Sequence, residues 1–250
     1  MSSFISKVKK KLKNGIWYPF YNSFYDKVSV DKKEILLLSR NGLALESNIL
    51  AILTELSSPE YKDFRKVVAV HKNKKAQVQK KLEHYGLSVD KLLSTELPSY
   101  YYHLAKAGWL VTDSTFPGRF VKKEGQTILN VWHGTPLKKM GQDNPEERCI
   151  TGNVMRILLQ SDYLLFPNLY MEEKMAHAYN LPELYQGRVL HEGYPRNCIF
   201  FHPEKGAKLK ETLGYAGFQL SIYMPTFRGT SDSVEETAYV QLVKDHLSRI

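Results

Sequence analysis

One histidine stands where an apolar run of the sequence ends, and its neighbours suit phosphate chemistry. The run from Ile128 to Trp132 is rich in β-branched and aromatic residues and predicts a strand buried on both faces. His133 follows it directly, and the turn and basic residues after it are Gly134, Thr135, Pro136, Lys138 and Lys139. A neutral imidazole beside two ammonium groups is what transfer of a phosphate ester needs. The alternative is a packed histidine in a tight turn with two solvated lysines, and these residues alone leave both open.

The chain before His133 alternates between predicted strands and helices. Residues 34–39 and 66–70 are apolar runs typical of buried strands, and residues 45–58 have helical spacing of their apolar side chains. The further elements we predict are helices at 72–85, 100–107, 153–160 and 169–179, strands at 109–112 and 163–168, a short element at 90–93 and a surface loop at 113–120. This alternation predicts a parallel, doubly wound sheet.

Three loops follow strands of this predicted sheet, at Arg40, Asp113 and His133. Parallel strands end at a common edge, so we expect these loops to gather there, where open α/β sheets bind ligands. None of them carries a G-x-G-x-x-G sequence, so a conventional dinucleotide site is not expected.

Composition limits the kind of protein that surrounds these loops. The 250 residues are 43% hydrophobic and 24% charged, which is ordinary for a globular protein of one large or two smaller domains. Cys149 and Cys198 are far apart, and the histidines show no metal-binding spacing. We therefore expect no disulfide framework, no metal and no cofactor, and a reducing compartment.

The excess positive charge is concentrated at the start of the chain. The net charge is +9, and a basic amphipathic segment at residues 1–30 carries Lys7, Lys9, Lys10, Lys11, Lys13 and Trp17. Its apolar residues have helical spacing, which predicts a helix lying on an anionic membrane surface. Each lysine contributes about 1 kcal/mol to such attachment. There is no run of the roughly 20 apolar residues that a membrane span needs, so we expect peripheral attachment at the cytoplasmic face. The alternative, a helix that packs its apolar stripe on the protein's own core, fits the pattern equally well.

A glycine and a proline mark a possible domain boundary late in the chain. Residues 193–197, with the sequence Gly-Tyr-Pro-Arg-Asn, predict a hinge after Arg196. A new strand is predicted at 219–225 and a helix at 234–250. We therefore expect one domain at 31–196 and the beginning of a second at 197–250.

Four motifs in this order resemble one enzyme family. They are Trp132 to Lys138, Phe166 to Asn168, Gly193 to Asn197 and Pro225 to Arg228. Together they are similar to the CDP-glycerol glycerophosphotransferase family, the teichoic acid primases and polymerases. The resemblance implies an α/β, GT-B-like fold, with an N-terminal Rossmann-like doubly wound parallel sheet and the incomplete start of a second Rossmann-like domain. It also implies transfer of glycerol phosphate, or a related polyol phosphate, from a CDP-activated donor to a lipid-linked or polymeric acceptor.

The resemblance assigns roles to particular residues. His133 matches the family's motif histidine, which implies a general base for the acceptor hydroxyl. The positions implied for the acceptor or its phosphate are Gly134, Thr135, Lys138, Lys139 and Arg196. Thr226 and Arg228 match a segment implied to lie near the donor diphosphate. For Arg196, bracing the hinge is the alternative to serving the cleft, and the stronger one.

The chain departs from the family pattern in three places. Cys198 stands where Asp is usual, and Phe227 stands where Trp is usual. After Arg228 the 250 residues contain neither the family's later His-Pro segment nor its Thr-Asp-Tyr-Ser-Ser run. We therefore expect the acceptor side with little of the donor side, as in a fragment or a truncated gene product. The second hypothesis is a non-catalytic membrane-surface or polymer-binding protein. Nucleic acid is not an expected partner, because the basic residues gather in an amphipathic end rather than a stripe with exposed aromatics.

Overall fold

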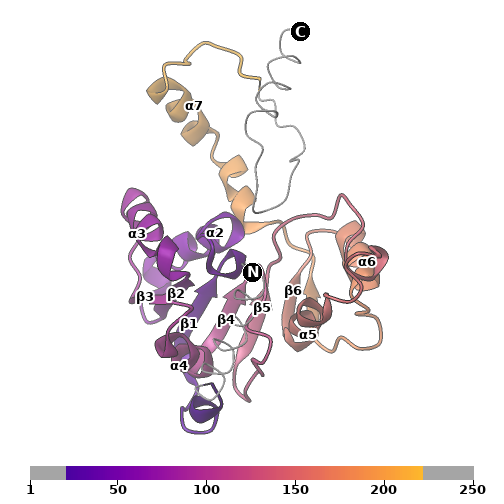
Figure 1. Ribbon diagram of the computed structural model, residues 1–250. Helices are drawn as coiled ribbons and strands as arrows, with labels where there is room; N and C mark the ends of the chain where they lie inside the picture. Colours follow the sequence, from indigo (N-terminus) through magenta and orange to yellow (C-terminus); the bar gives the residue numbers. More distant parts are fainter. Residues whose placement is uncertain (1–20, 222–250) are drawn as a thin grey trace, which may run out of the picture. The chain divides into compact units, whose positions relative to one another are not determined.

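The computed structural model describes residues 21–221, most of which form one α/β unit around a seven-stranded sheet. All neighbouring strands are parallel, and their order is β3-β2-β1-β4-β5-β6-β7 (Figure 1). The strands are β1 (Asp31–Leu38), β2 (Arg65–Val70), β3 (Lys91–Ser94), β4 (Ala107–Thr112), β5 (Thr127–Asn130), β6 (Tyr163–Leu165) and β7 (Arg188–Leu190). The predicted doubly wound parallel sheet is therefore confirmed.

Helices cover both faces of the sheet. The α-helices are α2 (Ser47–Glu55), α3 (Lys75–His84), α4 (Pro98–Lys106), α5 (Gly152–Gln160), α6 (Leu169–Ala178) and α7 (Pro203–Thr212). Short 3-10 helices include η1 (Arg40–Gly42), η4 (Gly141–Asp143) and η5 (Pro195–Phe201). By its internal contacts the chain divides into Met1–Phe201 and His202–Ile250, and α7 lies in the second unit. The boundaries at 30 and 196 stay predictions.

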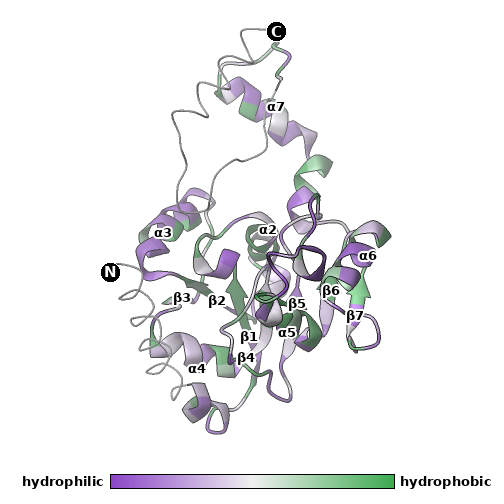
Figure 2. Ribbon diagram, turned by 45° about the vertical axis from the view of Figure 1, so that its right-hand side comes forward, coloured by the Kyte–Doolittle hydropathy of each residue, from purple (hydrophilic) through white to green (hydrophobic). Residues whose placement is uncertain are grey.

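The strand residues explain why helices pack on both faces. Leu36 and Leu38 of β1 point to the face that α4 and α5 cover, whereas Ile35 and Leu37 point to the face that α2 and α3 cover. Each of these side chains is almost completely buried, which contributes about 1.5–3 kcal/mol per side chain. Figure 2 shows the resulting contrast between apolar central strands and the hydrophilic surface of α3. A third apolar cluster packs β6 against α5 and α6.

The strand order reverses between β1 and β4. The chain builds outward from β1 to β3, returns through α4, and then continues on the other side from β4 to β7. In open α/β sheets, ligands bind beyond the carboxyl ends of the strands at such a reversal point. The loops at Arg40 and Asp113 follow the two strands that flank it.

Two expectations need correction, and one helix was not expected. The strand predicted to run to Trp132 ends at Asn130, because Trp132 has a left-handed backbone with φ +48°. The predicted surface loop at 113–120 is partly core: Phe116 and Phe120 are each 1% exposed. Side chains of α5 allow this burial, since Asn153 donates to the Phe116 carbonyl. The short element at 90–93 is strand β3, and α7 has no counterpart in the prediction.

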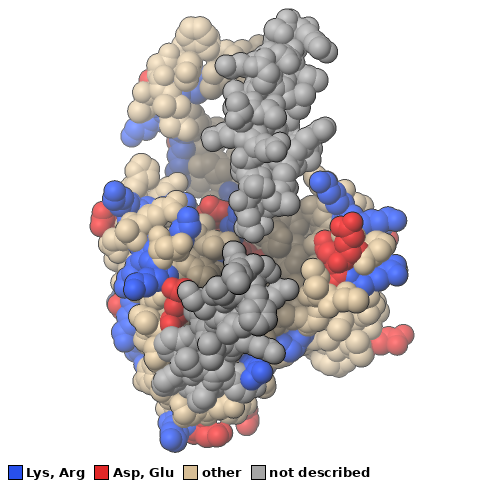
Figure 3. Space-filling view, in the orientation of Figure 1, with Lys and Arg blue, Asp and Glu red and all other residues tan. Residues whose placement is uncertain are grey.

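Charged side chains are distributed over several parts of the visible surface. In Figure 3, Lys and Arg appear both on the side of α3 and on the side of α6, with Asp and Glu among them. No helix within residues 21–221 combines the length and the apolar content needed to cross a bilayer. The predicted membrane segment, with Lys7, Lys9, Lys10, Lys11, Lys13 and Trp17, lies mostly outside the described residues.

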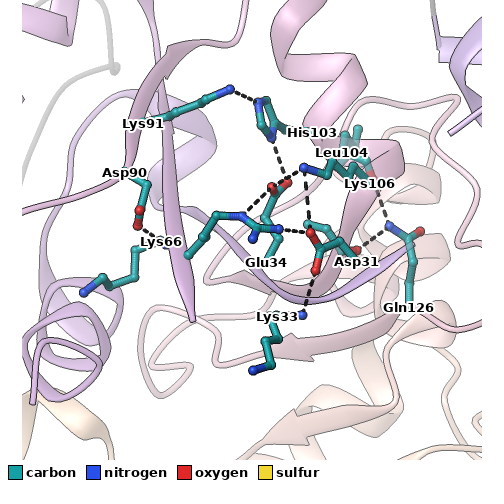
Figure 4. Close-up of polar contacts among 12 residues, drawn as sticks. Asp31, Lys33, Glu34, Lys66, Asp90, Lys91, His103, Leu104, Lys106 and Gln126 are labelled. Atoms are coloured by element: carbon teal, nitrogen blue, oxygen red, sulfur yellow. Dashed lines mark hydrogen bonds and ion pairs between the residues drawn. The ribbon is translucent and has the colours of Figure 1, made fainter. Parts of the chain in front are cut away.

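The amino edge of the sheet is closed by a network of charges (Figure 4). Its members are Asp31, Glu34, Arg65, Lys91, His103 and Lys106. Glu34 is 1% exposed, lies 2.7 Å from His103 Nδ1, and pairs with Lys106 Nζ at 3.1 Å. Burial raises the pKa of Glu34, but the hydrogen bonds and charges of His103 and Lys106 outweigh it, so the pKa is lowered overall.

Candidate active site

A pocket of about 370 Å³ lies at the reversal point of the sheet. We call it the histidine pocket. The residues that line it are Arg40, Asn41, Leu43, Glu46, Ser47, Asp113, Ser114 and His133. They come from the segments that follow β1, β4 and β5, together with the start of α2. The prediction that the loops at Arg40, Asp113 and His133 gather at one edge is therefore confirmed.

The ring of His133 has a defined orientation. Its Nδ1 is 3.0 Å from the carbonyl oxygen of Asp113, and because a carbonyl only accepts, Nδ1 carries the hydrogen. The ring also stacks on Trp132, with centroids 4.4 Å apart and planes 26° from parallel. In the neutral ring the lone pair is therefore on Nε2, which has no hydrogen-bond partner among residues 21–221. This nitrogen is the one able to take a proton.

Two asparagines hold the backbone that presents His133. Asn48 of α2 donates from Nδ2 to the carbonyls of Val131 at 3.4 Å and Trp132 at 3.2 Å. Asn130 accepts at Oδ1 from the Trp132 amide at 3.0 Å. These bonds replace the sheet ladder where the chain leaves β5. Sequence reasoning missed both residues, although Asn130 at the end of an apolar strand was a signal.

Backbone conformations of high energy gather around the histidine pocket. Six non-glycine residues among those described have positive φ, and four of them, Arg40, Asn41, Ser47 and Trp132, lie in or next to the histidine pocket; the other two follow α6. Such conformations cost about 1–3 kcal/mol each and persist only where the surroundings impose them. At η1 the imposing contacts come from the loop after β4: Ser114 Oγ accepts from the Asn41 amide at 2.9 Å. Strain of this kind is typical of functional sites.

Asp113 places a buried carboxyl group beneath His133. Its side chain accepts from Ser39 Oγ at 3.0 Å and from the Arg40 amide at 2.7 Å, and the residue is 1% exposed. Burial raises the pKa of this carboxyl group, and the two hydrogen bonds and the charge of His133 only partly oppose it. The side chains of Asp113 and His133 therefore interact electrostatically, in addition to the contact between the ring and the Asp113 carbonyl.

Arg196 braces the loop from the opposite side. Its Nη1 donates to the carbonyl of His133 and to Ser47 Oγ, both at 2.9 Å. The guanidinium also lies over the ring of Tyr194, 4.4 Å from its centroid. These contacts are those of a brace, the stronger of the two predicted alternatives, and a direct contact of Arg196 with a ligand stays a prediction.

The residues after His133 lie in two separate regions, one near Tyr194 and one in a second cavity. Gly134 faces open space, because a Cβ at this position would have no neighbour within 4 Å, and Thr135 Oγ1 is 3.4 Å from the hydroxyl of Tyr194. Lys138 and Lys139 do not line the histidine pocket and instead line a separate cavity of about 490 Å³. Gly141 then fixes the end of the loop, because its φ is +61° and a Cβ there would overlap the carbonyl of Ala178.

Two of the predicted binding residues belong to the C-terminal part of the chain. Thr226 and Arg228 lie outside the described residues. Within residues 21–221, no group of three or more His, Cys, Asp and Glu side chains is arranged to hold a metal ion. Cys149 and Cys198 are free and exposed.

The fold is similar to that of a solved bacterial enzyme. A structure of the wall teichoic acid polymerase TagF superposes with a TM-score of 0.65 at 22% identity, covering 84% of this chain and 49% of that chain. A TagF variant soaked with CDPG gives a TM-score of 0.65 at 21% identity, covering 88% of this chain and 55% of that chain. At this level of identity the likeness concerns the fold.

Curated relatives are similar in sequence as well. The teichoic acid poly(glycerol phosphate) polymerase of Bacillus subtilis strain 168 is 28% identical over 246 residues, which cover 90% of this chain and 31% of the relative. The corresponding polymerase of Bacillus spizizenii is 31% identical over 144 residues, 53% of this chain and 35% of the relative. The chain thus spans about a third of the length of these relatives. Residues 20–248 match the family model described as CDP-glycerol:poly(glycerophosphate) glycerophosphotransferase, and the chain belongs to that family.

Proposed function

We propose that this chain transfers glycerol phosphate, or a related polyol phosphate, from CDP-glycerol to a lipid-linked or polymeric acceptor in the synthesis of teichoic acid or a related polymer. Family membership supports the reaction class. The observation that carries the proposal is the orientation of His133, whose Nδ1–H donates to the Asp113 carbonyl while Nε2 is left without a partner in the described residues.

In the proposed reaction, the acceptor hydroxyl attacks the phosphorus that bears the glycerol. A new P–O bond forms there, the P–O bond to CMP breaks, and CMP leaves with its electron pair. The hydroxyl proton passes to Nε2 of His133, and the Asp113 carbonyl stabilises the Nδ1–H of the resulting imidazolium.

The donor side of the proposal rests on motifs. Thr226 and Arg228 are proposed to bind the CDP diphosphate, with the second Rossmann-like domain of a GT-B architecture around them. Gly134 and Thr135 would approach the acceptor. The reaction uses CDP-glycerol as substrate without a further cofactor. Lys7, Lys9, Lys10, Lys11, Lys13 and Trp17 are proposed to attach the protein peripherally to the cytoplasmic face of the membrane.

Release of CMP tests the proposal directly. The purified chain is incubated with CDP-glycerol and a glycerol phosphate acceptor, and CMP is measured against time. We expect release that requires the acceptor and is abolished in the His133→Ala variant. Release that is equal in the variant would remove His133 from the reaction.

The second candidate is a protein of the same fold that binds polymer or membrane without catalysis. The cavity at Lys138 and Lys139, separate from the histidine pocket, favours a binding function of that surface. Absence of both CDP-glycerol binding and CMP release, with acceptor binding retained, would select this candidate.

A further inference from the structure

The loop that begins at His133 ends in a cavity with a strong excess of positive charge. This cavity, about 490 Å³ in volume, is lined by four cationic residues, Lys138, Lys139, Arg148 and Lys174, and by one carboxylate, Asp143. We call it the basic cavity. Arg148 and Lys174 come from the turn before α5 and from α6, so the four cations meet only in the folded chain.

The acidic residues around the basic cavity already have partners. Asp143 contacts His177 Nδ1 at 2.6 Å, and Glu147 accepts from the Gly141 amide at 2.8 Å and from Asn144 at 3.0 Å. Glu173 forms an exposed ion pair with Lys174 Nζ at 2.9 Å, so Lys174 is partly compensated. Lys138 and Lys139 form no ion pair with any residue in the described part of the chain. Figure 3 shows basic side chains on the side of α6 with acidic ones among them. The positive excess therefore lies on the loop and at Arg148.

The polar and apolar parts of the lining suit a chain of alternating phosphates and short carbon units. Cations attract phosphate oxygens through charge-assisted hydrogen bonds. Tyr170 and Leu137, which are 53% and 93% exposed, add apolar surface beside them. Each repeat of a linear polyol phosphate has a phosphate for the cations and a short carbon unit for the apolar surface.

The basic cavity lies within reach of a polymer whose reacting end is at His133. Lys138 follows His133 by five residues, so their Cα atoms are at most about 18 Å apart. A polymer whose terminal hydroxyl reaches His133 would extend over this distance within a few repeats.

We propose that the basic cavity is a second acceptor subsite, which binds phosphodiester groups of the polymer behind its reacting end. Lys138, Lys139, Arg148 and Lys174 bind the phosphates, and His133 deals only with the terminal hydroxyl. This inference rests on the proposed function but concerns binding, so it is tested without measuring transfer.

The test uses synthetic tri(glycerol phosphate) as the probe and calorimetry on the whole chain. The double variant Arg148→Gln with Lys174→Gln removes two charges from the basic cavity. The matched control, Lys75→Gln with Lys80→Gln, removes two exposed charges from α3. We expect binding about tenfold weaker in the cavity variant and nearly unchanged in the control, because each exposed charge contributes up to about 1 kcal/mol.

Two further variants separate the possible outcomes. Lys174→Gln alone keeps the bond from Arg148 Nε to the Gln142 carbonyl, so a weaker affinity in this variant excludes loss of that local structure as the cause. His133→Ala is expected to bind the probe within about twofold of wild type, since the phosphates lie away from it. If His133→Ala leaves CMP release intact, the proposed function fails while this binding result stands.

Vesicles of phosphatidylglycerol distinguish a lipid headgroup from the polymer. We expect the cavity variant to bind them as well as the control does. Equal binding of tri(glycerol phosphate) by the cavity variant and the control would overturn the proposal. So would a cavity variant that loses vesicle binding and keeps the probe.

Discussion

The two edges of the sheet each hold a histidine whose Nδ1–H donates to an oxygen, and they differ in the other ring nitrogen. At the amino edge His103 is 3% exposed, Nδ1 lies 2.7 Å from Glu34, and Nε2 lies 3.2 Å from Lys91 Nζ (Figure 4). At the carboxyl edge His133 is exposed, and its Nε2 has no partner within residues 21–221. Both nitrogens of the His103 ring have partners, whereas Nε2 of His133 has none in the described part of the chain.

The carboxyl groups at the two edges of the sheet also differ in how far neighbouring groups compensate the effect of burial. Glu34 is surrounded by cations that lower its pKa against the effect of burial. Asp113 accepts from a hydroxyl and an amide, and burial raises its pKa. Charges compensated by neighbours stabilise the fold, whereas incompletely compensated charges and strained backbone are found where a ligand is expected.

The largest effect is expected from His133→Gln. The rate of CMP release should fall about 1000-fold, because the proton acceptor is lost. The free energy of unfolding should change by less than about 0.5 kcal/mol, since the side chain is exposed. His103→Gln is the matched control, with the opposite result expected: loss of stability measured by urea unfolding. A large stability loss in His133→Gln would contradict the contrast between the edges.

Glu34→Gln removes the buried negative charge from the network at the amino edge of the sheet. We expect a loss of about 3 kcal/mol in unfolding free energy at neutral pH, because Lys106 and Arg65 lose the counter-charge of a buried carboxylate. The pKa of Glu34 is lowered in the folded protein, so its contribution is complete above the ordinary pKa of a glutamate and is lost as pH falls through the folded value. The difference from wild type should therefore shrink in acid. A difference that stays constant down to acid pH would show that the charge of Glu34 is not its cause.

Arg196→Lys tests the brace. Lysine keeps the charge but cannot make both contacts of the guanidinium, so we expect about 1 kcal/mol less stability and about tenfold slower CMP release. The loss should appear in kcat with the KM for CDP-glycerol unchanged, because Arg196 acts through the His133 backbone. An increase in KM with normal kcat would instead place Arg196 in contact with the substrate.

Asp113→Asn should have the smallest effect on stability, and in the opposite direction. Its pKa is raised in the folded protein, so the ionised carboxyl group destabilises the fold at neutral pH and the protonated one does not. We expect a small gain in melting temperature at neutral pH that disappears as pH falls through the folded pKa of Asp113. A melting temperature below that of wild type at neutral pH would show that its hydrogen bonds with Ser39 and Arg40 outweigh the cost of burying the charge.

Much of the fold could be predicted because buried parallel strands are continuous apolar runs. Residues 34–39 and 66–70 are such runs, and they correspond to β1 and β2. The gathering of loops followed from parallel strands ending at one edge. The loop at 113–120 was misjudged because its Gly, Pro, Ser and Thr residues are typical of surfaces, while its two phenylalanines point inward.

The remaining site residues had no local signal. Asn48 lies in a helix 83 residues before the carbonyl it binds at Val131, and nothing in its own segment indicates that contact. Arg148 and Lys174 are isolated basic residues in sequence, and only the packing of α6 against the loop brings them to Lys138. Contacts between segments of this kind depend on tertiary structure.

Asn48 also has a consequence for how the protein folds. Its side chain contacts both the end of β5 and the amide of Arg196, which lies 148 residues after Asn48 in the chain. Contacts of such long range form late, because the intervening chain must first be ordered. During synthesis the pocket cannot be completed until the ribosome has released residue 196. Catalytic geometry would thus be a late event in folding, and formation of the stack between Trp132 and His133 offers a spectroscopic signal for its timing.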